Sequence, residues 1–180
     1  DEEPKRIDPR LAGPFQSRDS GWMTGLRPPG AVTDQETRAL DFPDGRVVLM
    51  SGATEANNWV VRSVMARHPQ DHVLVSADVH ASVWQPARLF APRMDVLATD
   101  GDGCVTPAAL AAALRPDTRL FCCSHASNET GVIHNVAALS ALCARRGVLC
   151  LVDGAQAVGH VPVRLSELCC EFYVFAAHKF

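Results

Sequence analysis

The chain has 180 residues, with 17 Lys and Arg against 20 Asp and Glu, a formal charge of -3 and 47% hydrophobic residues. These values fit a folded domain with a substantial core, and they exclude collagen, coiled coils and disordered tails. Binding to nucleic acid or to a charged membrane surface needs a dense basic face, so the near-neutral balance argues against both as main partners.

The first 45 residues contain many residues that break regular structure. Six prolines and five glycines lie there, so we expect residues 1–45 to form an irregular N-terminal segment. The charged start does not resemble a secretory signal, and no window approaches 18 consecutive apolar residues, which predicts neither a signal peptide nor a membrane-spanning helix. The chain does not begin with Met, which suggests processing or a fragment.

From residue 46 onward, short apolar runs alternate with stretches rich in Ala and Leu. Six runs predict strands, at 46–50, 72–77, 94–98, 119–124, 148–152 and 172–176. Most are apolar throughout, as expected for strands buried on both faces of a parallel sheet. Four stretches between them predict helices, at 55–67, 82–90, 107–114 and 136–145. The sequence therefore predicts one α/β domain over residues 46–180, a mostly parallel sheet with helices on both faces.

Local signals mark the ends of several elements. Thr106 before Pro107 is typical of a helix start, and Gly147 after two arginines is typical of a helix end. The Asp-Gly-Asp-Gly run at 100–103 predicts a turn, because the ligand spacing of a calcium loop does not follow it.

Seven cysteines, an odd number without a Cys-x-x-Cys pair, argue against a disulfide scaffold and against a zinc ribbon. Cys122, Cys123 and Cys150 lie in apolar runs, which predicts buried, reduced thiols. We therefore expect no metal site and a reducing, cytoplasmic location.

Ligands of a parallel sheet bind at the carboxyl ends of its strands, next to helix N-termini. The residues that follow the predicted strands carry hydroxyl, imidazole, amide, carboxylate and amine groups, at 51–55, 78–80, 125–128, 153–156 and 177–179. So many reactive groups at one edge are hard to attribute to packing, which predicts a functional site there.

The segment Ser51-Gly52-Ala53-Thr54 lies between a predicted strand and a predicted helix. Its N–H groups and the Thr54 hydroxyl are suited to hold a phosphate at the positive end of the helix. A turn of small residues is also a common tight connection, so both interpretations stay open. The segment is neither a Walker A loop nor a Gly-x-Gly-x-x-Gly motif.

Asp153 and Lys179 each follow a predicted strand, and each has two interpretations. Asp153 could cap the next turn, or it could hold a cationic ring nitrogen. Lys179, with Lys5 one of only two lysines, could be an ordinary surface residue; in apolar surroundings its charged form would be disfavoured and the amine would be nucleophilic. An amine, a carboxylate, a helix N-terminus and a histidine together match the needs of pyridoxal 5'-phosphate.

From about residue 47 to residue 180 the chain resembles the class V, fold-type I aminotransferase superfamily, and within it the cysteine desulfurases and selenocysteine lyases. The matching stretches are SGATEANN at 51–58, SADVHASV at 76–83, SNETG at 127–131, VDGAQAVGHVPV at 152–163 and FYVFAAHKF at 172–180. The resemblance implies the large, cofactor-binding domain of such an enzyme.

The resemblance also implies roles for single residues. Lys179 would form the Schiff base with pyridoxal 5'-phosphate and, once released, act as general base, while Asp153 would pair with the pyridine nitrogen. His80 would be catalytic as well, stacking on the ring and helping to move protons, or it would be a loop histidine satisfied by local hydrogen bonds. Asn128 and Gln156 would contact the phenolic oxygen side of the cofactor.

The phosphate would be held by Thr54, the backbone of Ala53 and His178. The family usually has a hydroxyl residue where this chain has Ala176, so we expect one phosphate hydrogen bond to be missing, at a cost of roughly 1.5 to 3 kcal/mol. The chain stops one residue after Lys179, and the family's catalytic cysteine, substrate-binding arginine and small C-terminal domain are expected beyond that point.

The leading hypothesis is the cofactor-binding part of a cysteine desulfurase, which converts L-cysteine to L-alanine and passes sulfur to an acceptor as a persulfide. The alternatives are a selenocysteine lyase, a truncated non-catalytic protein of the same fold, and another class V enzyme such as an aminotransferase. We expect no turnover by these 180 residues alone. A homodimer and a sulfur acceptor protein are implied by the resemblance only.

Overall fold

A computed structural model describes residues 40–42, 47–176 and 179 of the chain. Its strands are β1 (His72–Ser76), β2 (Arg93–Leu97), β3 (Thr118–Ser124), β4 (Leu149–Asp153) and β5 (Phe172–Val174). Its helices are α2 (Ala53–Arg67), α3 (Ala81–Phe90), α4 (Pro107–Ala113) and α5 (Val136–Arg146), with a short 3-10 helix at Leu165–Glu167. Five of the six predicted strands and all four predicted helices are therefore present, with small differences at their ends.

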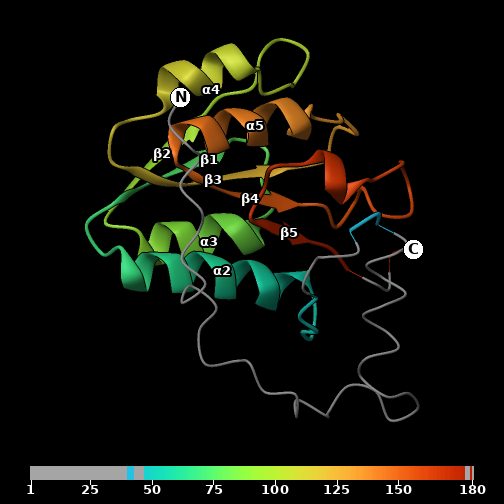
Figure 1. Cartoon of the computed structure of the whole chain (residues 1–180), viewed down its shortest axis with the longest axis horizontal. Coiled ribbons are helices and arrows are strands. Elements are labelled where there is room, and N and C mark those ends of the chain that lie inside the picture. Colours follow the sequence, from blue (N-terminus) through green and yellow to red (C-terminus); the bar gives the residue numbers. More distant parts are fainter. Residues whose placement is uncertain (1–39, 43–46, 177–178, 180) are drawn as a thin grey trace.

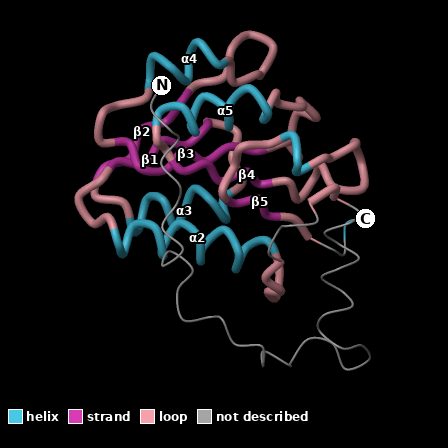
Figure 2. The backbone as a smooth tube through the Cα atoms, viewed as in Figure 1, coloured by secondary structure: helices cyan, strands magenta, loops and turns pink. Residues whose placement is uncertain are grey.

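The five strands form one sheet in the order β2-β1-β3-β4-β5, and every neighbouring pair is parallel. Helices α2 and α3 lie against one face of this sheet, and α4 and α5 lie against the other (Figure 1). The same three layers are clear in the backbone trace (Figure 2). The predicted α/β fold, a parallel sheet covered by helices on both faces, is confirmed.

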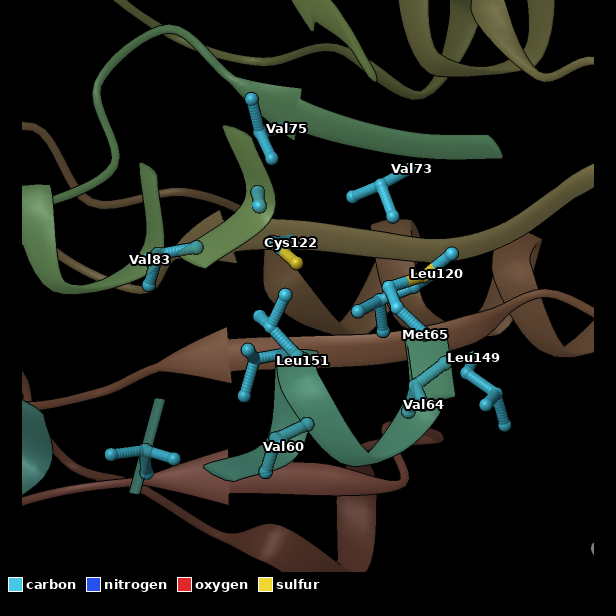
Figure 3. Packing of buried hydrophobic residues seen from close by; sticks show 13 residues of the cluster. Val60, Val64, Met65, Val73, Val75, Val83, Leu120, Cys122, Leu149 and Leu151 are labelled. Carbon is cyan, nitrogen blue, oxygen red and sulfur yellow. The ribbon is translucent and has the colours of Figure 1, made fainter. Parts of the chain in front are cut away.

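The central strand β3 divides its side chains between two hydrophobic cores. Leu120 and Cys122 belong to the core shared with α2 and α3, whereas Phe121 and Cys123 belong to the core shared with α4 and α5. This alternation follows from the two-residue repeat of a strand. Figure 3 shows the first core, where side chains of α2 pack over those of the sheet. Full burial of one large apolar side chain contributes roughly 1.5 to 3 kcal/mol, so both helix layers are anchored to the sheet.

The helix ends follow the local sequence signals. The hydroxyl of Thr106 accepts a hydrogen bond from the N–H of Ala109 at 3.1 Å and so caps the start of α4. Helix α5 ends at Gly147, whose φ of 67° lies in the left-handed region that glycine adopts without strain. The predicted turn at 100–103 is also present, and the Asp100 carboxylate accepts hydrogen bonds from the N–H groups of Asp102 and Cys104.

The strand predicted at 46–50 is wrong. Residues 47–50 have no regular secondary structure; Val48 and Leu49 are 49% and 39% exposed, and the segment lines an apolar cavity of about 450 Å³ beside α2 and β5. An apolar β-branched run indicates a buried strand, but a strand forms only where a neighbour offers backbone partners. Most of the irregular segment predicted at 1–45 lies outside the described residues.

All seven cysteines are free, and Cys122, Cys123, Cys143 and Cys150 are buried. Burial raises the pKa of the Cys122 thiol well above its usual range. The predicted burial of Cys122, Cys123 and Cys150 is confirmed. In the described part of the chain, no helix combines the length and the apolar character needed to cross a bilayer.

Candidate cofactor site

A polar cavity of about 410 Å³ opens at the carboxyl edge of the sheet. Seven of the eight predicted site residues line it, namely Ala53, Thr54, His80, Asn128, Asp153, Gln156 and Lys179. These residues follow different strands or begin α2, so the parallel arrangement of the strands brings them together. The eighth residue, His178, lies outside the described residues.

The N-terminus of α2 forms one wall of the cavity. Its N-cap residue is Gly52, which has no side chain to cap the first N–H groups of the helix. The N–H of Ser51 donates to the Glu55 carboxylate at 2.7 Å, and hydrogen bonds from Ser51 hold the pKa of Glu55 below its usual value. The backbone at Ala53 and Thr54 therefore presents an uncapped, positive helix end to the cavity, which is suited to bind an anion.

Asp153 is the last residue of β4 and only 6% of its surface is exposed. One carboxylate oxygen, Oδ1, accepts a hydrogen bond from the N–H of Ala155 at 3.0 Å, which is the turn-capping role expected of an aspartate here. The other oxygen, Oδ2, accepts from the side-chain amide of Asn57 at 2.8 Å. A carboxylate held at both oxygens keeps a fixed position at the cavity wall.

His80 serves as the N-cap of α3. Its Nδ1 accepts a hydrogen bond from the backbone N–H of Ser82 at 3.1 Å and lies 2.9 Å from the Ser82 hydroxyl. The ring is exposed and lines the cavity. The structure is compatible with both interpretations of His80. The ring caps the start of α3, as a histidine satisfied by local hydrogen bonds would, and it also lines the cavity, as a site residue would.

The loop that carries His80 is held by hydrogen bonds to the Asp78 carboxylate, which is partly buried. The Asp78 carboxylate lies 2.7 Å from Nε2 of His134 and accepts a hydrogen bond from the Ser76 hydroxyl at 2.7 Å. Burial would raise the pKa of Asp78, but the hydrogen bonds from His134 and Ser76 outweigh it and hold that pKa below its usual value. The N–H of Val105 donates to Nδ1 of His134, so the ring proton lies on Nε2 and points at Asp78.

The remaining predicted residues lie on loops around the cavity mouth. Asn128 is exposed and Gln156 is partly buried, and each follows the end of a strand by three or four residues. The sequence around Lys179 is apolar, yet its side chain is exposed to solvent and faces the cavity. Its backbone N–H donates to the carbonyl of Ala176 at 3.0 Å, and Ala176 itself lines the cavity.

Sequence reasoning missed two residues that support the site, Asn57 and Ser82. Both are buried, and the Asn57 amide donates to the Ser82 hydroxyl at 2.9 Å as well as to Asp153. A signal was present, because Asn57 lies three and four positions before Val60 and Val61, on the buried face of α2. A polar residue on an apolar helix face requires a buried partner.

The chain resembles several proteins of known type. Cysteine desulfurase IscS of Pseudomonas savastanoi pv. phaseolicola is 37% identical over 163 residues, which are 86% of this chain and 40% of that protein. Cysteine desulfurase IscS of Proteus mirabilis is 33% identical over 138 residues, which are 74% of this chain and 34% of that protein. The chain therefore spans less than half the length of these curated relatives.

Solved structures of similar proteins share the fold of this chain. A NifS-like protein superposes with a TM-score of 0.78 and 23% identity, over 83% of this chain and 43% of that chain. The cysteine desulfurase CsdA from Escherichia coli superposes with a TM-score of 0.75 and 26% identity, over 83% of this chain and 39% of that chain. The family model for class V aminotransferases matches residues 38–180. The chain belongs to the class V aminotransferase family.

Proposed function

We propose that this chain binds pyridoxal 5'-phosphate and that the protein to which it belongs is a cysteine desulfurase. The observation that carries the proposal is the convergence of a helix N-terminus, a held carboxylate, an imidazole and an amine on one cavity. Relatives named as cysteine desulfurases support the choice of L-cysteine as substrate.

The donor set in the cavity fits the chemical parts of this cofactor. The uncapped start of α2 at Ala53 and Thr54 suits a phosphate, with His178 as a further proposed contact. The buried Asp153 carboxylate suits a protonated ring nitrogen, because an opposite charge stabilises the cation. Asn128 and Gln156 would contact the oxygen on the ring, and their amides can donate to it.

When bound, pyridoxal 5'-phosphate supplies an electron sink for cleavage of a bond at the substrate Cα. Asp153 would hold a proton at the ring nitrogen, which strengthens that sink. The Lys179 amine would bond to the cofactor and, once displaced by substrate, would take a proton at the substrate Cα. His80 would cover one face of the ring and exclude water from it. The products would be L-alanine and sulfur carried as a persulfide, passed to an acceptor protein.

One observation favours a second candidate, a protein of this fold that binds the cofactor weakly and does not turn over substrate. Ala176 lines the cavity where the family usually has a hydroxyl residue, so one phosphate hydrogen bond is lost. A selenocysteine lyase and another class V enzyme are further alternatives, because they would use the same lysine. A homodimer and a cytoplasmic location are proposed on the family resemblance.

Two experiments test the proposed function. Titration with pyridoxal 5'-phosphate should produce a visible absorption band that is absent in Lys179→Ala, and failure to see a band would refute cofactor binding. Sulfide and alanine release from L-cysteine is then compared with selenide and alanine release from L-selenocysteine. Cysteine turnover supports the desulfurase, faster selenocysteine turnover supports the lyase, and cofactor binding without either supports the non-catalytic candidate.

A further inference from the structure

A series of hydrogen bonds joins Asp153 and His80, which are proposed to contact the nitrogen and one face of the cofactor ring. Asn57 of α2 donates to Oδ2 of Asp153 at 2.8 Å and to the Ser82 hydroxyl at 2.9 Å. The Ser82 hydroxyl lies 2.9 Å from Nδ1 of His80. The four side chains therefore connect the end of β4 with the start of α3 through α2.

The direction of each bond in this series follows from the donors and acceptors available. An ionised carboxylate only accepts, so the amide nitrogen of Asn57, and not its oxygen, faces Asp153. The same nitrogen has a second N–H for the Ser82 hydroxyl. That hydroxyl accepts from Asn57 and keeps its own proton to donate to His80.

His80 receives a second donor at the same nitrogen. The backbone N–H of Ser82 can only donate, and it lies 3.1 Å from Nδ1 of His80. With two donors aimed at it, Nδ1 is an acceptor, and the proton of the neutral ring lies on Nε2. A proton on Nδ1 would lose the hydrogen bond from the backbone N–H of Ser82 and would require the Ser82 hydroxyl to turn and accept.

The burial of Asn57 is not explained by packing alone. Its side chain is fully buried on the apolar face of α2, and its Oδ1 has no hydrogen-bond partner among the described residues. An unpaired buried amide oxygen destabilises a fold. An apolar side chain of similar shape would avoid this cost. We therefore attribute the presence of an asparagine here to the two hydrogen bonds that its amide donates, to Asp153 and to Ser82.

We propose that Asn57 is a positioning residue that sets both Asp153 and His80 for the cofactor. It holds Oδ2 of Asp153 directly, and through Ser82 it keeps His80 as the neutral ring with its proton on Nε2. His80 then presents a ring face and an Nε2–H donor to the cavity. This proposal rests on the proposed cofactor binding.

The first test needs no cofactor. Nitrogen-15 NMR of the full chain, at alkaline pH where imidazoles are neutral, should show His80 with an unprotonated Nδ1 and a protonated Nε2. Ser82→Ala should raise the fraction with the proton on Nδ1. Ser140→Ala is the matched control, because Ser140 is a buried helical serine on the opposite side of the sheet. A proton on Nδ1 of His80 in the unmodified chain would overturn the proposal.

The second test measures cofactor affinity in a double-mutant cycle. Asn57→Leu keeps the shape and removes the donors, so it should weaken binding of pyridoxal 5'-phosphate about tenfold. In Asp153→Ala, where the direct partner is gone, the same change should cost at most about threefold. Equal losses in both backgrounds would show a merely structural role and refute the proposal.

The two readouts separate the possible failures. If the chain binds no pyridoxal 5'-phosphate, the proposed function fails, while the NMR experiment still decides how Ser82 and His80 are bonded. If Asn57→Leu does not fold, Ser82→Ala takes its place in the affinity measurement, with Ser140→Ala again as the control. A Ser82→Ala affinity equal to that of Ser140→Ala would then contradict the proposal.

Discussion

The Asp153 carboxylate at the end of β4 accepts a hydrogen bond at 2.8 Å from the amide of Asn57, which lies 96 residues earlier in α2. This bond crosses from the helix layer to the sheet at the edge of the cavity. The position of the carboxylate therefore depends on how α2 packs on the sheet, and hence on a core far larger than the site.

Replacing Ala176 should strengthen cofactor binding. Ala176→Ser puts a hydroxyl into the cavity wall at the position where the family usually has one. A hydrogen bond to a charged phosphate contributes roughly 1.5 to 3 kcal/mol, which is at least about a tenfold gain in affinity for pyridoxal 5'-phosphate. Equilibrium titration measures it, and Ala112→Ser on the exposed face of α4 is the control. An unchanged affinity in Ala176→Ser would mean that this position does not face the phosphate.

The turn after β4 should not tolerate a larger residue at Gly154. A Cβ atom at this position would collide with the ring of Tyr173, whose hydroxyl lies 2.6 Å from Nδ1 of His125. Gly154→Ala should lower the free energy of unfolding by about 1 to 3 kcal/mol, because the partly buried Tyr173 ring must move. Denaturant unfolding measures the loss. Gly101→Ala, where a Cβ meets nothing within 4 Å, should change stability far less, and equal effects would argue against the collision.

The hydrogen bonds that His134 and Ser76 donate to the Asp78 carboxylate should make stability depend on acid pH. The native pKa of Asp78 lies below its unfolded value, so the ionised form stabilises the fold above about pH 4, and that contribution is lost as pH falls through the native pKa. Asp78→Asn should therefore be less stable than the unmodified chain at pH 6, by about 1 to 3 kcal/mol.

The stability difference between the two chains should shrink as the pH is lowered from about 5 to 3, as followed by urea unfolding. A difference that stays constant over this range would show that the ionised form of Asp78 does not stabilise the fold more than the protonated form.

The cysteines should differ sharply in reactivity. Cys169 is exposed, whereas Cys122 and Cys150 are completely buried, and burial raises the pKa of Cys122. A thiol reacts as its thiolate, so an alkylating reagent should modify Cys169 first and reach Cys122 and Cys150 only on unfolding. Timed labelling with peptide mass spectrometry measures this order. Modification of all three at one rate in the native chain would contradict the packing of β3 and β4.

Much of the fold could be predicted from the sequence because its strands are buried on both faces. An uninterrupted apolar run such as 148–152 leaves little choice other than an interior strand, and β4 lies there. Residues 47–50 are also apolar throughout, but they form no strand. Composition reports how well a segment suits a strand, but pairing depends on neighbours that are distant in the sequence.

The location of the site could be predicted for a related reason. The carboxyl ends of parallel strands share one edge, so residues after different strands meet without any knowledge of their contacts. The link from Asp153 to Ser82 through Asn57 could not be predicted in this way. It joins three elements, and the pairing of a helical amide with one particular carboxylate depends on tertiary packing.

The measurement that tests cofactor binding most directly is reduction of the chain with borohydride in the presence of pyridoxal 5'-phosphate, followed by peptide mass spectrometry. The chain offers an internal control, because Lys5 and Lys179 are its only lysines. We predict one reduced adduct, on Lys179, and its loss in Lys179→Ala with Lys5 unmodified. An adduct distributed equally over both lysines, or one that persists in Lys179→Ala, would contradict a cofactor site at the carboxyl edge of the sheet.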